Sequence, residues 1–267
     1  MKSWMLFVAA TVPLSVLSLL MAQDKPDAKK VEPEELRLSR AQVGIFRVKN
    51  AETNEDIERI EHPLLRYTDP AREDSNGTLW AWGRKGRPVA VLELFKHSDW
   101  NFWVQAFHAT DDTPLMVTAP GRPTWTPKSS NLKFQAFASA PVPAETAVAR
   151  LRRMKEFAQK FSAHEFWDPK NSRFELRLLA QPVHRYDDSE KGLIDGAIFI
   201  IAHGTNPEAT LFIEAAKDKD QNAGYWRFAI GRSSAAELVI LYDDKEVYHE
   251  PRIPFELPTD NPVWLVK

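Results

Sequence analysis

Short, mainly apolar segments recur along the chain, and turn-forming residues bound each segment. Segments of this length between turn residues are typical of β-strands. The pattern predicts strands in two groups, first at residues 77–83, 89–96, 102–108 and 115–119, then at residues 196–203, 209–215, 225–231 and 238–242. Because short turns separate consecutive strands, we expect an antiparallel meander in each group.

A helical pattern separates the two groups of strands. Apolar residues recur at helical spacing across residues 144–164, with Pro143 at the start, as expected at the first turn of a helix. The basic residues of this segment are interpreted as its solvated face. A weaker helical pattern at residues 33–43 precedes the first group, so each group would consist of a helix followed by strands.

The two groups also match each other in sequence. Residues 63–95 align without a gap to residues 182–214 with eight identities in 33 positions, where average residue usage predicts roughly two. The sequence therefore predicts an internal duplication. The expected fold class is α+β and β-rich, with two tandem related meanders joined by a helix as a pseudo-twofold sandwich or barrel-like body. Residues 36–142 would form the first repeat, and residues 143–267 the joining helix and the second repeat.

The N-terminal segment has the pattern of an export signal. Residues 1–22 contain a basic start at Lys2, then an apolar run that Pro13 interrupts. The run is short for a membrane anchor, so we expect cleavage near Ala22 and no membrane association afterwards. Residues 23–35, rich in charged residues and proline, would form a flexible leader. The mature protein is predicted to be periplasmic or secreted.

Composition and motifs exclude several functions. The chain has no cysteine, so thiolate metal sites and cysteine nucleophiles are excluded. A net charge of −2 gives no general attraction to nucleic acid. No phosphate loop, dinucleotide fingerprint or nucleophile elbow occurs, and we expect no cofactor.

One charged motif recurs in both repeats and is the main candidate for binding. Arg66, Tyr67 and Asp69 recur as Arg185, Tyr186 and Asp188. These residues are candidates for a paired anion site. The alternative is that arginine and aspartate form an ion pair that closes each repeat, while the tyrosine packs its ring.

The tryptophans suggest a core rather than a ligand platform. Trp80, Trp82 and Trp125 align with apolar or aromatic residues of the second repeat, which favours core packing. Trp100 lies nearer a predicted loop and is the better candidate for stacking on a glycan.

Histidines are the starting point for catalysis or metal binding. His164 and Asp168 are spaced like ligands on a zinc-peptidase helix, although no third ligand is evident. His184 and His203 stand where the first repeat has other residues. These two histidines are candidate bases, with Asp187, Asp188 or Glu208 as the orienting carboxylate.

Residues 63–70, 77–83, 163–169 and 174–179 resemble a family of uncharacterised exported proteins of planctomycete-type bacteria. The resemblance covers most of residues 55–265 and implies export and a common fold, with no implied activity.

Three functions remain open from the sequence. The first is an exported, non-catalytic binding or interaction protein with a ligand cleft between the repeats. Its partner would be a glycan, a small molecule or another protein. The second is a cell-envelope hydrolase that uses one of the histidines, and the third is a self-associating envelope component.

Overall fold

The computed structural model describes residues 33–69, 74–97, 102–217, 224–254 and 256–266. The predicted export signal, residues 23–32 of the predicted leader and Trp100 lie outside these residues. Strands dominate the described residues, which confirms the β-rich fold class. No helix within these ranges is long and apolar enough to cross a membrane.

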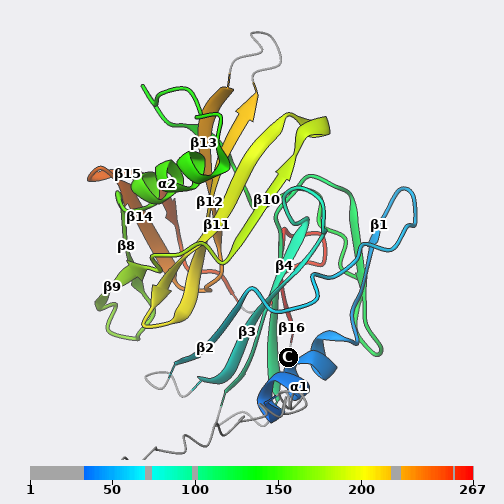
Figure 1. The fold of residues 1–267 in the computed structure, drawn as a ribbon. Coiled ribbons are helices and arrows are strands. Elements are labelled where there is room, and N and C mark those ends of the chain that lie inside the picture. Colours follow the sequence, from blue (N-terminus) through cyan, green and yellow to red (C-terminus); the bar gives the residue numbers. More distant parts are fainter. Residues whose placement is uncertain (1–32, 70–73, 98–101, 218–223, 255, 267) are drawn as a thin grey trace, which may run out of the picture. The chain divides into compact units, whose positions relative to one another are not determined.

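The smaller of the two main sheets is antiparallel, in the order β16-β5-β4-β3-β2 (Figure 1). Its strands are β2 (Leu65–Asp69), β3 (Asp74–Trp82), β4 (Ala90–His97), β5 (Trp103–Ala109) and β16 (Val263–Val266). The predicted strands at residues 77–83, 89–96 and 102–108 correspond to β3, β4 and β5. The C-terminal strand β16 returns to this sheet, where Val263 lies opposite His108 of β5.

Helix α1 (Glu34–Val43) and a separate two-stranded sheet lie beside this sheet. The helix confirms the weaker pattern at residues 33–43, so the predicted leader extends two residues into α1. The small sheet pairs β1 (Arg47–Asn50) with β6 (Leu115–Thr118). The strand predicted at residues 115–119 therefore forms, but it pairs with β1 rather than continuing the meander.

Within the described residues the larger sheet has nine strands, in the order β15-β14-β8-β9-β11-β12-β13-β7, with β10 paired to β11. Its strands are β7 (Gln135–Ala136), β8 (Phe161–Phe166), β9 (Arg173–Leu178), β10 (His184–Asp188), β11 (Leu193–His203), β12 (Asn206–Lys217), β13 (Gly224–Arg232), β14 (Glu237–Tyr242) and β15 (Lys245–Glu250). A short 3-10 turn, η1 (Ser189–Lys191), follows β10. All four strands predicted for the second repeat occur, as β11 to β14.

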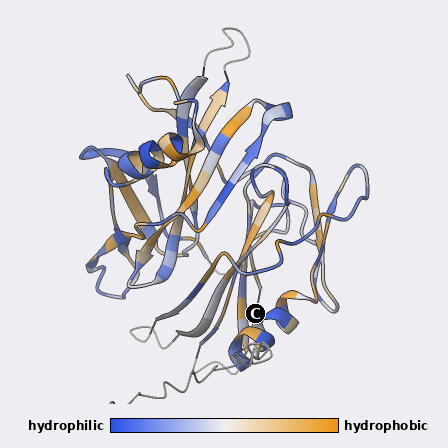
Figure 2. Cartoon of the chain, viewed as in Figure 1, coloured by the Kyte–Doolittle hydropathy of each residue, from blue (hydrophilic) through white to orange (hydrophobic). Residues whose placement is uncertain are grey.

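The helix predicted at residues 144–164 is too long. Helix α2 spans Ala147–Ala158 and begins after Thr146, whose hydroxyl accepts a hydrogen bond from the Ala149 amide at 3.3 Å. Residues 161–166 form β8 instead, because this segment pairs with β14 on one side and β9 on the other. Figure 2 shows both hydrophilic and hydrophobic residues along α2, as expected for a helix that buries one face.

Three apolar clusters of the described residues hold these layers together. One lies between the two main sheets and includes Leu79 and Val91 of the smaller sheet with Ile198 and Phe212 of the larger. A second lies between the smaller sheet, α1 and the β1–β6 pair, and it contains Trp80, Trp82 and Trp125. The third joins β11 to β13 with α2, β8 and β14. The three tryptophans are at most 2 % exposed, so the prediction that they form core is confirmed.

Two glycines at aligned positions of the sequence have the same role in the structure. Neither Gly77 nor Gly196 has a positive φ, so backbone angles do not require glycine at these positions. Each lies opposite the tyrosine of the repeated motif, Tyr67 or Tyr186. A Cβ atom at either glycine would overlap the tyrosine ring. The glycine is therefore required by the close approach of the ring.

Replacing Gly196 by alanine is expected to lower the free energy of unfolding by roughly 2 kcal/mol, because the buried Tyr186 ring must move. Urea unfolding of the Gly196→Ala variant would measure the loss. In a Tyr186→Ala background the same substitution should cost little, since no ring remains to be displaced. Equal losses in both backgrounds would contradict this explanation.

Candidate functional site

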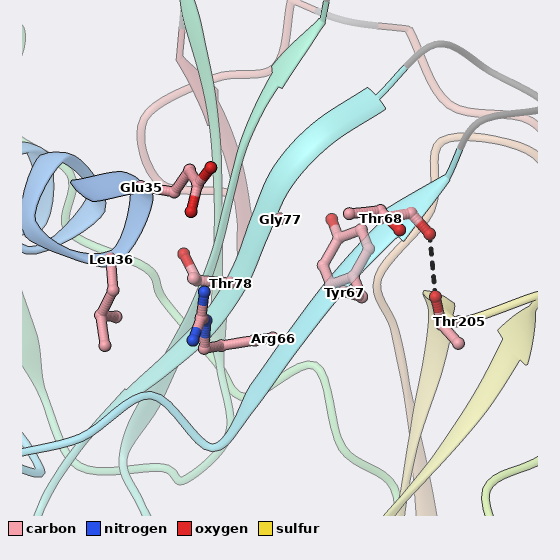
Figure 3. A pocket seen from close by; sticks show the side chains of 8 residues that line it. All are labelled: Glu35, Leu36, Arg66, Tyr67, Thr68, Gly77, Thr78 and Thr205. Carbon is pink, nitrogen blue, oxygen red and sulfur yellow. Dashed lines mark hydrogen bonds between the residues drawn. The ribbon is translucent and has the colours of Figure 1, made fainter. Parts of the chain in front are cut away.

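The pocket that contains residues of the repeated motif lies between α1, β2, β3 and the β11–β12 turn (Figure 3). Its volume is about 450 Å³, within the range of small-molecule sites. Figure 3 shows Glu35, Thr78 and Arg66 grouped on one side, with Tyr67 on the other side near Thr205. The structure thus brings together residues from both predicted repeats.

Helix α1 positions the acidic side of this pocket. The Ser39 hydroxyl lies 2.7 Å from the Thr78 hydroxyl in a buried hydrogen bond between α1 and β3. Thr78 also accepts a hydrogen bond from the Trp80 indole at 3.0 Å. This network fixes the helix on the sheet, so the first turn places Glu35 and Leu36 at the pocket.

Two hydrogen bonds fix the opposite side. The Tyr67 hydroxyl donates to the buried carboxylate of Glu93. The Thr205 hydroxyl, in the turn between β11 and β12, donates to the Thr68 carbonyl at 2.8 Å. The wall that carries Tyr67 and Thr68 is thereby tied to the larger sheet.

Arg66 and Arg185 occupy equivalent sequence positions but differ in their contacts. Arg185 forms an ion pair with Asp195 at 2.5 Å, and Arg150 of α2 contacts the same carboxylate at 2.9 Å. Arg66 has no hydrogen bond or ion pair through its side chain among the residues that the structure describes. In the sequence alignment the counterpart of Asp195 is Asn76, which carries no charge. Arg66 is therefore an exposed guanidinium that faces a pocket.

The predicted pairing of arginine and aspartate within the motif does not occur at its second occurrence, residues 185–188. Arg185 pairs with Asp195, whereas Asp188 is 4 % exposed and its Oδ1 has no hydrogen-bond partner among the described residues. The tyrosines behave as the structural interpretation predicted, since each ring is buried and each hydroxyl is bonded, Tyr186 to Glu214 at 2.9 Å. The side chain of Asp69 and all of Trp100 lie outside the described part.

A buried charged cluster, not found from the sequence, joins the two main sheets. Glu214 of β12 is fully buried and accepts from Arg87 at 2.8 Å and Arg227 at 2.8 Å. Both guanidinium groups also lie over the Phe134 ring, at 4.5 and 4.4 Å from its centroid. Burial by itself lowers the pKa of Arg87, but the Glu214 carboxylate outweighs this effect and the net pKa is raised.

The candidate catalytic histidines do not line a described pocket. His184 stacks on Tyr186 and has no carboxylate partner among the described residues, and burial lowers its pKa. His203 lies at the end of β11 with its ring against Phe174. Glu208 is buried and accepts from the Asn206 amide at 3.0 Å. The side chain of Asp187 is exposed.

The proposed metal ligands also fail to assemble. His164 lies on strand β8 rather than on a helix, and burial lowers its pKa. Both carboxylate oxygens of Asp168 are bonded to Ser172, at 2.6 and 2.8 Å, and this bonding lowers the pKa of Asp168. The described residues contain no group of three or more side chains arranged to hold a metal ion.

One histidine that sequence reasoning did not select lies beside a carboxylate at a cavity. His249 Nε2 is 3.2 Å from Glu237 Oε1 at the rim of a second cavity, which Ser129 and Ser130 also line. No hydrogen bond joins either serine to His249 in the described part of the chain. His249 and Glu237 could serve as base and orienting acid, but no serine nucleophile is bonded to His249, so the described residues form no catalytic triad here.

Comparison of the chain with models of known protein families, with curated proteins and with solved structures finds no match to any of the three.

Proposed function

We propose that this protein is an exported, non-catalytic binding protein whose site is the pocket between α1, β2, β3 and the β11–β12 turn. The ligand is a small polar molecule with an anionic group that pairs with Arg66. Glu35 would accept hydrogen bonds from the remainder of the ligand, and the exposed Thr68 hydroxyl would accept or donate one. The observation that carries the proposal is the unpaired Arg66 guanidinium at a preformed pocket.

The contrast between the two repeats supports this assignment. Where the arginine serves the fold, as Arg185 does, its charge is neutralised by Asp195 and it binds the Ala147 carbonyl at 3.3 Å. Arg66 keeps its full capacity for a bidentate contact with a carboxylate or phosphate. Glu35 likewise has no hydrogen bond or ion pair among the described side chains, so the pocket presents one positive and one negative group.

The proposal includes an origin by internal duplication. Equivalent tyrosines lie over equivalent glycines, and each tyrosine hydroxyl donates to a buried glutamate, Glu93 or Glu214. A helix precedes the strands in both halves, at α1 and α2. Shared packing of this kind, together with the sequence alignment, supports two copies of one module, of which the first has kept its arginine free for a ligand.

Export of the protein rests on the pattern of residues 1–22, and the resemblance to exported planctomycete-type proteins agrees with it. Detection of the mature N-terminus near Gln23 in a periplasmic or culture fraction would test this part of the proposal.

Calorimetric and thermal-shift titration with amino acids, dicarboxylates, monosaccharides and inorganic anions tests the binding function. A ligand at 100 times its dissociation constant stabilises the protein by about 2.7 kcal/mol, which should raise the melting temperature of a chain of this size by roughly 5–10 °C. A shift with a divalent metal that a chelator reverses would favour an enzyme instead. No shift with any compound would point to a macromolecular partner and would overturn the small-molecule proposal.

Replacing Arg66 by glutamine is expected to weaken binding of the ligand at least tenfold, because a charge-assisted contact is lost. The fold should be unaffected, since Arg66 is exposed and makes no hydrogen bond or ion pair with another described side chain. The matched control is Arg47→Gln, which removes the same charge from an exposed position outside the pocket. Equal affinity of the two variants would contradict the role of Arg66.

A further inference from the structure

A second cavity, of about 520 Å³, lies beside the segment that carries the C-terminus back to the smaller sheet. Four parts of the chain line it: residues 129–135, the end of β13, strand β15, and residues 253–263. None of these residues belongs to the pocket around Arg66. The chemistry of this cavity is therefore independent of the function proposed above.

Arg232 is the central charged group of the cavity wall. It is 4 % exposed, and its guanidinium donates only to backbone carbonyls, of Ser234 at 2.9 Å, Ala236 at 2.6 Å and Pro251 at 3.1 Å. No carboxylate of the described residues lies within ion-pair distance of it. Carbonyl dipoles satisfy most of its donors, and Glu250 acts on its charge without an ion-pair contact. A buried charge that no carboxylate contacts is costly unless an opposite charge can approach it.

Three further donors point to an anionic occupant. The Tyr248 hydroxyl has no hydrogen-bond partner among the described residues, and burial raises its pKa to about 12, so it keeps its proton. The Asn131 side-chain nitrogen is buried without a partner. Lys133 is exposed and also lines the cavity.

The balance of charges indicates the class of ligand. Glu250 is the one carboxylate among the described residues that line the cavity, and it opposes the two positive charges of Arg232 and Lys133. The net charge of plus one suits a singly charged anion better than a doubly charged phosphate. Both oxygens of a carboxylate could accept from the amide, hydroxyl and guanidinium donors.

We propose that this cavity is a second binding site, which takes a small monocarboxylate and uses Arg232, Tyr248 and Asn131 as its donors. A purely structural role for Arg232 would explain its carbonyl contacts, since these hold residues 234–236 and 251 together. It would not explain why the Tyr248 hydroxyl and the Asn131 side-chain nitrogen, which have no hydrogen-bond partner among the described residues, line the same cavity.

Isothermal titration with acetate, benzoate and phosphate at constant ionic strength, in an Arg66→Gln background, tests this site separately from the first pocket. We expect saturable binding of one carboxylate per chain. Asn131→Asp should weaken it at least tenfold through charge repulsion, and the conservative Tyr248→Phe should weaken it about tenfold by removing one hydrogen bond to a charged group. Circular dichroism would verify that each variant is folded.

The matched control is Gln181→Glu, which adds the same negative charge as Asn131→Asp at an exposed position outside the cavity. It should leave carboxylate affinity unchanged. Unchanged affinity in Asn131→Asp, absence of saturable carboxylate binding up to about 10 mM, or binding of phosphate alone would each overturn the proposal. Absence of ligand binding at the Arg66 pocket in the wild type, with carboxylate binding at the second cavity, would refute only the first pocket.

Discussion

Replacing Glu214 by glutamine is expected to lower the free energy of unfolding by about 3–5 kcal/mol, the usual cost of breaking a buried ion pair. Glu214 is fully buried and receives hydrogen bonds from Arg87, Arg227 and Tyr186, at 2.8, 2.8 and 2.9 Å. Glutamine retains the size of the side chain but removes the carboxylate charge paired with both guanidinium groups, of which, among the described residues, Arg87 alone keeps a second ion pair, with Asp111 at 3.1 Å. Urea unfolding at neutral pH, monitored by tryptophan fluorescence, would measure the loss.

The position of this cluster determines what its loss should do. Arg87 belongs to the turn after β3, whereas Glu214 and Arg227 belong to β12 and β13, so the cluster joins the two main sheets. The matched control is Glu190→Gln, which breaks an exposed ion pair with Lys85 of the same turn, at 2.6 Å. That variant should lose less than about 1 kcal/mol. If the unfolding free energy of Glu214→Gln also fell by less than about 1 kcal/mol, the cluster's role in joining the sheets would be contradicted.

Strands were predictable from the sequence where local patterns decide them. β11 and β12 were found because long apolar runs end at Gly204 and the polar segment after Lys217. Both are buried on both faces, since they lie between two apolar clusters. The end of α2 was not predictable, because Phe161 continues the helical spacing of apolar residues. Only pairing with Tyr242, a residue far along the chain, makes residue 161 the start of a strand.

The sites were predictable only in part, for a similar reason. Comparison of the two aligned segments selected Arg66 and Tyr67, which line the first pocket. Glu35 and Thr205 come from other segments that only the fold brings near. Arg87 and Glu214 are 127 positions apart, and no local motif connects them. A signal was nevertheless present, because a lone glutamate inside the apolar run of β12 indicates a buried, paired charge.

His108 is expected to make the protein sensitive to acid. This residue of β5 is 2 % exposed, and neither ring nitrogen has a hydrogen-bond partner among the described residues. Burial, reinforced by the nearby positive charge of Arg232, lowers its pKa from 6.5 to about 3. The folded protein therefore keeps His108 neutral over a range in which the unfolded chain binds a proton.

The direction of the pH dependence follows from this difference. Below the unfolded pKa of 6.5 the unfolded state gains a proton that the folded state gains only near pH 3, so stability falls as the pH falls through this window. Between pH 7 and pH 4, His108 alone should cost about 3 kcal/mol of unfolding free energy. The His108→Leu variant removes the titrating group, so its stability should decrease less than that of the wild type over the same interval.

Chemical denaturation at a series of pH values would compare the wild type, His108→Leu and His62→Gln. His62 is an exposed histidine, so its variant should follow the wild-type profile. At neutral pH His108→Leu should be close to neutral or stabilising, because it replaces unpartnered polar nitrogens with an apolar side chain between Val91 and Val263. Parallel pH profiles of all three proteins would mean that His108 acquires its proton without penalty, and would contradict its burial as a neutral ring.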